Sequence, residues 1–310
     1  MLSRVAENLY WIGRYLQRAE NTARLVNVHS HLLMDIPPKA ITGWRPLIEI
    51  VGAERTFAEL YQEPSEANVI RFLLIDDRNP GSVVSSLRAA REGLRTTRDI
   101  MPREIWERVN DAYHWLRDSS ERSLQRRWRR DFLNRVIDMN LLTLGTLVSS
   151  MSRDVGYHFL SLGLNLEQAD MTTRILDART ASLIEPMAGE TLRPFESIQW
   201  MSILKSLTGY QMYRQHAKRR VSGAEVLRFL LQDARFPRSV RFCLNQAADV
   251  HLKELPARPE VGKELGRTRK LVQGADLDGL VSEGLSDYLD SIQRNLAQLH
   301  QVLHQAYFHR

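Results

Sequence analysis

The sequence predicts an all-α protein, a helical bundle built from two tandem, internally duplicated halves, residues 1–150 and 151–310. Three observations lead to this prediction. Apolar residues recur every three or four positions along most of the chain, as they do on the buried face of a helix. Gly (16 residues) and Pro (11 residues) are scarce, and no stretch alternates apolar and polar residues over the length of a strand. In addition, two segments of the first half recur in the second.

The clearest repeat is SEANVIRFLLIDDRNPGSV at 65–83, which returns as SGAEVLRFLLQDARFPRSV at 222–240 with 12 of 19 residues identical. The offset between these segments is 157 residues. Earlier in the chain, GRYLQRAENTARL (13–25) aligns with GLNLEQADMTTRI (163–175) at an offset of 150. The larger offset fits a longer connection in the second half, TASLIEPMAGETLRPFES at 180–197. Such self-similarity indicates one helical unit that occurs twice, with the two copies sharing one core.

The first expected element is a long amphipathic helix over 3–28, whose apolar residues mark one face. Pro37–Pro38 ends the following stretch, because proline lacks a backbone N–H and restricts the residue before it. Two shorter helices are expected over 44–61 and 65–75, joined by the acidic sequence EPSE.

The next helix is predicted to begin at Asn79–Pro80, since Asn caps helices and Pro suits their first turn. It should run to about Ile100 and stop before Pro102. The remaining expectations are helices over 102–117, 121–151 and 153–178, and looser connections between 255 and 285.

The composition excludes several classes of protein. With 43% hydrophobic and 26% charged residues, the chain is neither collagen-like nor disordered. It has no run of 18 apolar residues and no signal-peptide pattern, so we expect a cytoplasmic protein without a membrane span. The lone Cys243 excludes a disulfide framework and indicates a packed residue. His300 and His304 lie one helical turn apart without a clear third ligand, so we expect no metal and no cofactor.

A carboxylate recurs at the edge of the apolar face of the repeated helix. Glu20 precedes Arg24 by four residues, and Asp170 precedes Arg174 by the same spacing, which places each pair on one side of a helix. One interpretation is a repeated structural ion pair. The other is a carboxylate that addresses a ligand amine or a partner surface.

A second stripe of the same helix lies nearly opposite its apolar face. It comprises Glu7, Trp11, Arg14 and Arg18. A buried face does not normally hold two arginines, so this stripe is either solvated or an interface for protein recognition.

The strongest charge pattern is a stripe of four arginines spaced by three, four and three residues: Arg88, Arg91, Arg95 and Arg98. Like charges so spaced repel one another, so the stripe needs acidic neighbours or an anionic ligand such as a peptide or phosphate. The first three matching positions of the second half are Asn245, Ala248 and Leu252. Any anion site therefore belongs to the first half.

The element Asp-x-Arg-x-Pro-x-Ser occurs twice, with Asp76 and Arg78 in the first half and Asp233 and Arg235 in the second. Its Pro and Ser fit a helix start, and its Asp and Arg can pin the turn. The alternative is a recognition loop at a helix N-terminus, where backbone amides favour anions.

The segments LSRVAENLYWIGRYLQRAENTARLV, IDDRNPGSV and FLSLGLNLEQADMTTRILDAR resemble the bacterial alpha-E domain family, and the resemblance covers essentially the whole chain. It implies a helical fold with a characteristic glutamate, which falls on Glu20 with Asp170 as its counterpart. It also implies a role in peptide synthesis or modification, since members are encoded beside, or fused to, circularly permuted ATP-grasp proteins and transglutaminase-like cysteine peptidases. Where the family shows Gly-Arg and Glu-Arg-Ala in the second copy, this chain has Gly163–Leu164 and Glu167–Gln168–Ala169.

The leading hypothesis is an accessory or scaffold protein without intrinsic activity. It would bind an ATP-grasp-type ligase, a transglutaminase-like peptidase or their peptide product, mainly through the arginine-rich first half. One alternative is an enzyme of that pathway that uses Glu20 and nearby arginines. Another is a basic helical nucleic-acid binder, in which Arg122, Arg126, Arg127, Arg129 and Arg130 around Trp128 grip phosphates. Homo-oligomer formation stays open.

Overall fold

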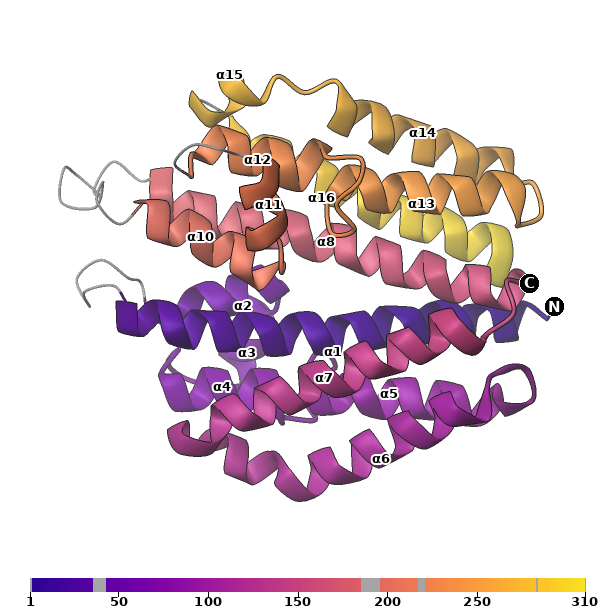
Figure 1. Cartoon of the computed structure of the whole chain (residues 1–310), viewed down its shortest axis with the longest axis horizontal. Coiled ribbons are helices and arrows are strands. Elements are labelled where there is room, and N and C mark those ends of the chain that lie inside the picture. The colour runs from indigo at the N-terminus through magenta and orange to yellow at the C-terminus, as the bar shows by residue number, and fades with distance from the viewer. Residues whose placement is uncertain (1, 36–42, 185–195, 217–220, 283, 310) are drawn as a thin grey trace.

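Two long helices that run in the same direction form the centre of the molecule (Figure 1). They are α1 (Ser3–Asp35) and α8 (Val155–Ile184). The computed structural model describes residues 2–35, 43–184, 196–216, 221–282 and 284–309, and within these ranges the regular structure is helical, with no strand. The predicted all-α fold is confirmed.

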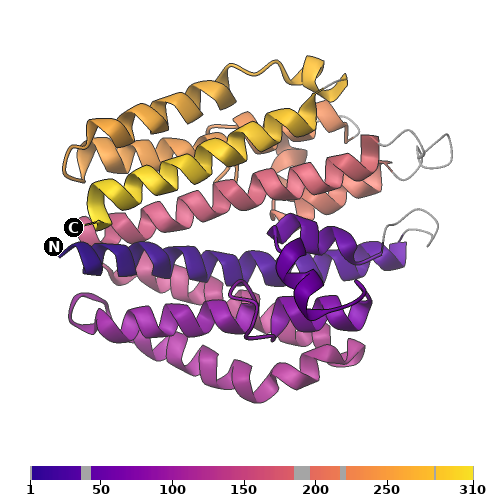
Figure 2. The same ribbon diagram turned by 180° about the vertical axis from the view of Figure 1, so that it is seen from behind.

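The other helices pack around this central pair, those of the first half mainly below it and those of the second half above it in Figure 1. Figure 2 shows the same arrangement from behind. The first group is α2 (Arg45–Val51), α3 (Glu54–Leu60), α4 (Glu66–Leu74), α5 (Val83–Thr96), η2 (Arg98–Ile100), α6 (Arg103–Ser119), η3 (Ser120–Leu124) and α7 (Arg126–Ser150). The second group is α10 (Glu196–Ser206), α11 (Tyr210–His216), α12 (Gly223–Gln232), α13 (Val240–Lys253), α14 (Pro259–Gln273), α15 (Leu277–Ser282), α16 (Leu285–Leu303) and the terminal π-helical turn His304–Phe308.

The backbones of α1 and α8 touch at two glycines. A Cβ atom on Gly13 would overlap the carbonyl oxygen of Leu160 and lie 3.0 Å from the Leu164 nitrogen. A Cβ atom on Gly163 would overlap the carbonyl oxygen of Tyr10. Only glycine permits this approach, which is the close helix contact that a glycine inside a helix commonly serves.

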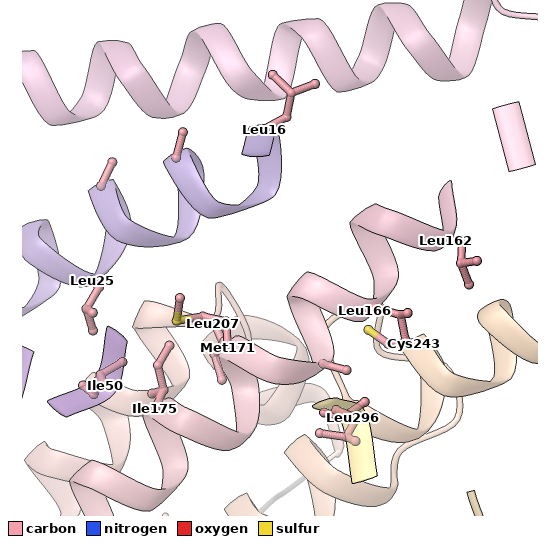
Figure 3. Close-up of a cluster of buried hydrophobic side chains, with 14 of the residues drawn as sticks. Leu16, Leu25, Ile50, Leu162, Leu166, Met171, Ile175, Leu207, Cys243 and Leu296 are labelled. Carbon is pink, nitrogen blue, oxygen red and sulfur yellow. The ribbon is translucent and has the colours of Figure 1, made fainter. Parts of the chain in front are cut away.

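The hydrophobic core extends on both sides of this contact as one continuous cluster of buried side chains. Figure 3 shows part of it, where Leu25 of α1 and Ile175 of α8 lie near Ile50 of α2, and Leu166 of α8 lies near Cys243 of α13. Cys243 of α13 is fully buried there, and burial raises the pKa of its thiol to about 12. This cysteine is a packed residue, as predicted, and its thiol stays protonated at neutral pH.

Two predicted helix boundaries between residues 44 and 100 are wrong. The single helix expected over 44–61 is divided into α2 and α3 at Gly52, whose φ of +64° is left-handed. The helix expected from Asn79 begins instead at Val83, with the Ser82 hydroxyl accepting a hydrogen bond from the backbone N–H of Ser85 at 3.1 Å. The Asn79 side chain accepts from the N–H of Gly81 and holds the turn before the helix.

Other differences concern later segments. The helix that the sequence predicted from residue 121 starts at Arg126, after the short 3₁₀ segment η3. The region 255–285, expected to be loose, contains α14 and α15. Pro37–Pro38 and most of the longer connection at 180–197 lie outside the described residues. That the two halves are duplicated copies stays a prediction from the sequence.

We predict that Gly163→Ala lowers the free energy of unfolding by about 2–4 kcal/mol, because the new methyl group must push α8 away from the Tyr10 carbonyl. The measurement is urea unfolding followed by circular dichroism. The matched control is Gly145→Ala in α7, where a Cβ meets nothing within 4 Å. It should raise the stability by up to about 1 kcal/mol, since Ala favours a helix over Gly. Equal effects at both positions would contradict the role given to the close contact.

Candidate functional site

A buried ionic network joins α1 to α8 beside the glycine contact. Glu167 of α8 is 3% exposed and accepts hydrogen bonds from two arginines of α1. Arg18 donates through Nε at 2.6 Å and through Nη2 at 2.9 Å, and Arg14 donates through Nε. The side chains of Arg14 and Arg18 are only 12% and 24% exposed. Two arginines thus share one carboxylate away from bulk water.

The arginines determine the charge state of Glu167. Burial alone would raise the pKa of its carboxyl, but the positive charges of Arg14 and Arg18 outweigh burial and lower that pKa to about 2. The carboxylate therefore stays ionised near neutral pH. A group in that state is an anchor for cations and a poor general acid or base at pH 7.

The network continues from Arg14 to the last helix. Arg14 Nη1 donates to the Tyr10 hydroxyl at 2.8 Å, and the distance from that hydroxyl to His300 Nδ1 is 2.9 Å. Burial, followed by the positive charge of Arg14, lowers the pKa of His300 to about 4. The imidazole is therefore neutral at pH 7, and its Nδ1 can accept from the tyrosine. His300 links α16 to α1, whereas His304 lies 3.5 Å from Glu7.

Glu20 belongs to a second buried cluster. Its Oε1 accepts from Arg24 Nε and from Arg238 Nη2, both at 2.6 Å, and its Oε2 accepts from Gln17 Nε2 at 3.0 Å. Burial raises the pKa of Glu20, but Arg238 and Arg24 lower it further than burial raises it. The predicted pairing of Glu20 with Arg24 is present. Its counterpart joins Arg174 to Asp170 at 2.9 Å.

Two glutamines extend the Glu20 cluster from α1 to α8. Gln17 Nε2 donates to Gln168 Oε1 at 2.9 Å, and the same oxygen accepts from Arg238 Nη1 at 3.0 Å. Gln168 stands where the family resemblance expects an arginine. An arginine at this position would bring a further positive charge against Arg238, whereas the amide supplies an acceptor.

A polar pocket of about 320 Å³ opens beside the Glu167 network. The turn at 79–81 and the α2–α3 corner at Gly52 close its other sides. The polar residues that α1 and α8 contribute to its lining are Arg14, Arg18, Thr22, Glu167, Asp170 and Arg174. The pocket thus brings together four residues that the sequence proposed as ligand-binding, two from each half, and it does not include Glu20.

The second stripe of α1, Glu7, Trp11, Arg14 and Arg18, differs from the solvated face that was one of its two predicted environments. The stripe is not a solvated face, because α8 and the terminal turn His304–Phe308 pack against α1 and the His300 ring of α16 packs on Trp11. Arg14 and Arg18 pair with Glu167, and Trp11 is half-buried against the core. Glu7 reaches His304 at the end of the chain. The spacing of residues along α1 does not reveal that a carboxylate of α8 pairs with both arginines.

The α5 stripe is neutralised only in part, by one carboxylate. It comprises Arg88, Arg91, Arg95 and Arg98. Glu92 accepts from Arg91 Nη1 and from Arg95 Nε, each at 2.8 Å. The Arg98 guanidinium lies 3.8 Å from the ring centre of Trp106 in α6, a cation–π contact. Arg88 and Arg95 remain exposed on the surface.

The repeated Asp-x-Arg element pins its turn, as one interpretation predicted. Asp76 Oδ1 accepts from the backbone N–H of Arg78 at 3.0 Å, and Oδ2 accepts from the Tyr61 hydroxyl at 2.6 Å. Hydrogen bonds from Arg78 lower the pKa of Asp76 to about 2. In the second half, Asp233 accepts from the backbone N–H of Arg235 at 2.7 Å.

The basic segment at the start of α7 is partly occupied by an intramolecular partner. Arg129 is buried and donates to Glu66 of α4 at 2.7 Å, and Arg126 pairs with the same carboxylate. The Arg127 guanidinium lies over the Trp128 ring. Two of the five arginines proposed for phosphate contacts therefore hold α7 to α4.

Sequence reasoning missed the residues that organise the site. These are Tyr10, Glu167, Arg238 and His300, of which His300 was considered only as a metal ligand. One signal was available for Glu167. In the aligned segments Gln17–Arg18 matches Glu167–Gln168. The first segment therefore has the arginine and the second has the glutamate, and the two could pair between the helices.

Comparison with known proteins supports the helical fold. A family described as "a predicted alpha-helical domain with a conserved ER motif" matches residues 1–308. The chain is also 26% identical over 333 residues to uncharacterized proteins of Mycobacterium bovis and of two Mycobacterium tuberculosis strains. These matches cover 97% of this chain but 36% of each relative, so the chain spans about a third of their length. No solved structure matches the chain.

Within the part of the chain that the structure describes, no group of three or more His, Cys, Asp or Glu side chains is placed to hold a metal ion. Among the same residues, each helix is too short or too polar to pass through a membrane.

We predict that Glu167→Gln lowers the free energy of unfolding by about 3–5 kcal/mol, because it leaves Arg14 and Arg18 buried without a counter-charge. Guanidinium unfolding of the variant measures this loss. The control is Glu59→Gln, which removes an exposed helical pair with Arg55 and should change stability by no more than about 0.5 kcal/mol. A loss of that small size at Glu167 would show that the network is not essential to folding.

We predict that stability falls in two steps as the pH is lowered. Below pH 6.5 the unfolded chain protonates His300, which the folded protein keeps neutral until about pH 4. Below pH 4.5 the unfolded chain protonates Glu167, which stays ionised in the folded protein to about pH 2, and this step removes about 3 kcal/mol. Urea unfolding across this pH range measures both steps. His300→Asn should reduce the first step, and an unchanged first step would contradict the assignment.

Proposed function

Since the chain belongs to the Alpha-E family, we propose that it is an accessory helical protein of bacterial peptide synthesis or modification. It acts with an ATP-grasp-type peptide ligase and a transglutaminase-like peptidase. The family resemblance supplies these two partners. The mycobacterial relatives support a role in which this region acts together with other protein regions, because the matching region is only about a third of each of those chains.

The polar pocket between α1 and α8 is the observation that carries this proposal. Its lining holds three arginines and two carboxylates, and Glu167 is ionised at neutral pH because its pKa is lowered by Arg14 and Arg18. Charged groups locked in this way provide fixed hydrogen-bond donors for a polar ligand. They do not provide a group that exchanges protons at neutral pH. The pocket therefore supports binding better than catalysis.

The enzymatic alternative has less support. Glu20 is fully buried, and both of its oxygens are occupied by protein donors. With its pKa held below the usual value by Arg238 and Arg24, Glu20 is suited to holding α1 against the turn before α13. A catalytic role would require this cluster to open.

The hypothesis of nucleic-acid binding also has less support, because Glu66 pairs with two of the arginines on which it depends. Arg126 and Arg129 both pair with Glu66, so the segment around Trp128 presents less free charge than its sequence indicates. Arg88 of α5 is exposed and is better placed to meet an acidic surface of a partner protein, and Arg95, which pairs with Glu92, is exposed seven residues further along the same helix.

We predict that the tagged full-length chain, purified gently from the organism that encodes it, brings down the ligase, the peptidase or both. Mass spectrometry of the eluate identifies them. The double variant Arg88→Glu and Arg95→Glu should reduce recovery several-fold, because it reverses charge on the exposed face of α5. The control, Arg267→Glu, reverses an exposed arginine of α14 and should leave recovery unchanged.

Two outcomes would contradict this proposal. The first is a chain that elutes without either enzyme under conditions that preserve weak complexes. The second is elution with nucleic acid, with an affinity that falls steeply as salt is raised.

A further inference from the structure

The molecule contains two sites at matching positions, and its own chain fills one of them. Arg238 lies in the turn before α13 and is only 14% exposed. Its guanidinium donates to Glu20 at 2.6 Å, to Asn21 Oδ1 at 3.1 Å and to Gln168 Oε1 at 3.0 Å. This side chain closes the space between the turn and the two central helices.

The other site lacks such a side chain. At the offset of 157 the position that matches Arg238 is Gly81, in the turn before α5. Gly81 lines the polar pocket of about 320 Å³, and Arg18 and Asp170 line it from the two central helices. The space that Arg238 fills in one half is therefore open in the other.

The charges of the open pocket differ from those of the filled site. Arg18 occupies the position that matches Gln168, so the pocket offers an N–H donor where the filled site offers an oxygen acceptor. Arg18 uses Nε and Nη2 for Glu167, which leaves Nη1 available. Because Glu167 also serves Arg14, one positive charge is left over. A cation such as Arg238 would be repelled here, and an oxyanion would be attracted.

A buried hydroxyl group also points to a ligand. Thr22 is 1% exposed and lines the pocket, and its Oγ1 has no hydrogen-bond partner. The matching Thr172 is fully satisfied, since its Oγ1 donates to the Arg238 carbonyl at 2.9 Å and accepts from Gln168 at 3.1 Å. Buried polar groups normally have a partner. The unmet donor of Thr22 is therefore available to an occupant of the pocket.

Asp170 restricts the class of ligand that fits the pocket. Its Oδ2 accepts a hydrogen bond from Arg174, its side chain is 22% exposed, and it lines the pocket. A phosphate group carries about −1.5 to −2 charges, which exceeds the single surplus positive charge and would meet Asp170. A carboxylate matches the surplus, and an N–H group next to it can donate to Asp170.

We infer that the polar pocket binds the carboxyl end of a peptide or amino acid, with the carboxylate on Arg18 and Thr22 and the adjacent N–H on Asp170. This inference rests on the binding role proposed for the pocket and names its ligand class. The pocket holds this group in the space that Arg238 occupies in the other half.

The test is isothermal titration of the full chain with L-alanyl-L-alanine, its C-terminal amide and inorganic phosphate. The free acid should bind, and the amide should bind about tenfold more weakly, since it cannot form the charged hydrogen bonds. Phosphate should bind more weakly than the free acid. Equal binding of acid and amide, or tighter binding of phosphate, would overturn the assignment.

Two matched substitutions separate binding from folding. Thr22→Val should weaken binding of the free dipeptide about tenfold without lowering stability, because Oγ1 has no partner to lose. Thr172→Val should lower stability and leave dipeptide binding unchanged, because that hydroxyl serves the filled site. Wild-type binding by the Thr22 variant would refute the inference, as would a loss of stability equal to that of the Thr172 variant.

The result also separates this inference from the proposed partnership. If the ligase or peptidase is captured but the dipeptide does not bind, the ligand assignment is wrong and the partnership stands. If the dipeptide binds but neither enzyme is captured, the proposed partnership is wrong and the ligand assignment stands.

Discussion

Gly13 of α1 and Gly163 of α8 bring two helix backbones into contact, and the side chains beside that contact lose most of their access to water. The approach is possible only without a Cβ atom at either position. The polar residues that flank it must therefore find partners on the opposite helix. The ionic networks and the polar pocket follow from this one constraint on helix separation.

The cost of burying charge explains why both networks have the same form. A buried carboxylate is tolerated only when it is paired and hydrogen-bonded. Glu167 and Glu20 are each held by two arginines, so each cluster carries one surplus positive charge. In the Glu20 cluster, Arg238 also donates hydrogen bonds to the side-chain amide oxygens of Asn21 and Gln168. At Glu167 the surplus lies beside an open pocket, which is why we place ligand binding there and not at Glu20.

Much of the fold could be predicted because helical class depends on local periodicity. Helix ends were less predictable, because capping residues compete. Asn79 and Ser82 both suit a helix start, and the serine caps α5 while the asparagine holds the preceding turn. Gly52 divides the expected 44–61 helix through a left-handed conformation that the apolar pattern does not reveal. The glycines and prolines of 255–285 indicated loose connections, but the apolar residues of this region form the buried face of the helix α14.

The sequence by itself determined the helical class and those ion pairs whose partners lie within four residues, such as Glu20 with Arg24 and Asp76 with Arg78. Only the tertiary structure decided that Arg14 and Arg18 are buried on Glu167, about 150 residues away, and that Arg238 closes the cluster at Glu20. The physical reason is that spacing along one helix fixes which residues share a face. It does not fix which other elements cover that face, and α8 and the terminal turn His304–Phe308 pack on the side of α1 that its arginines made look solvated.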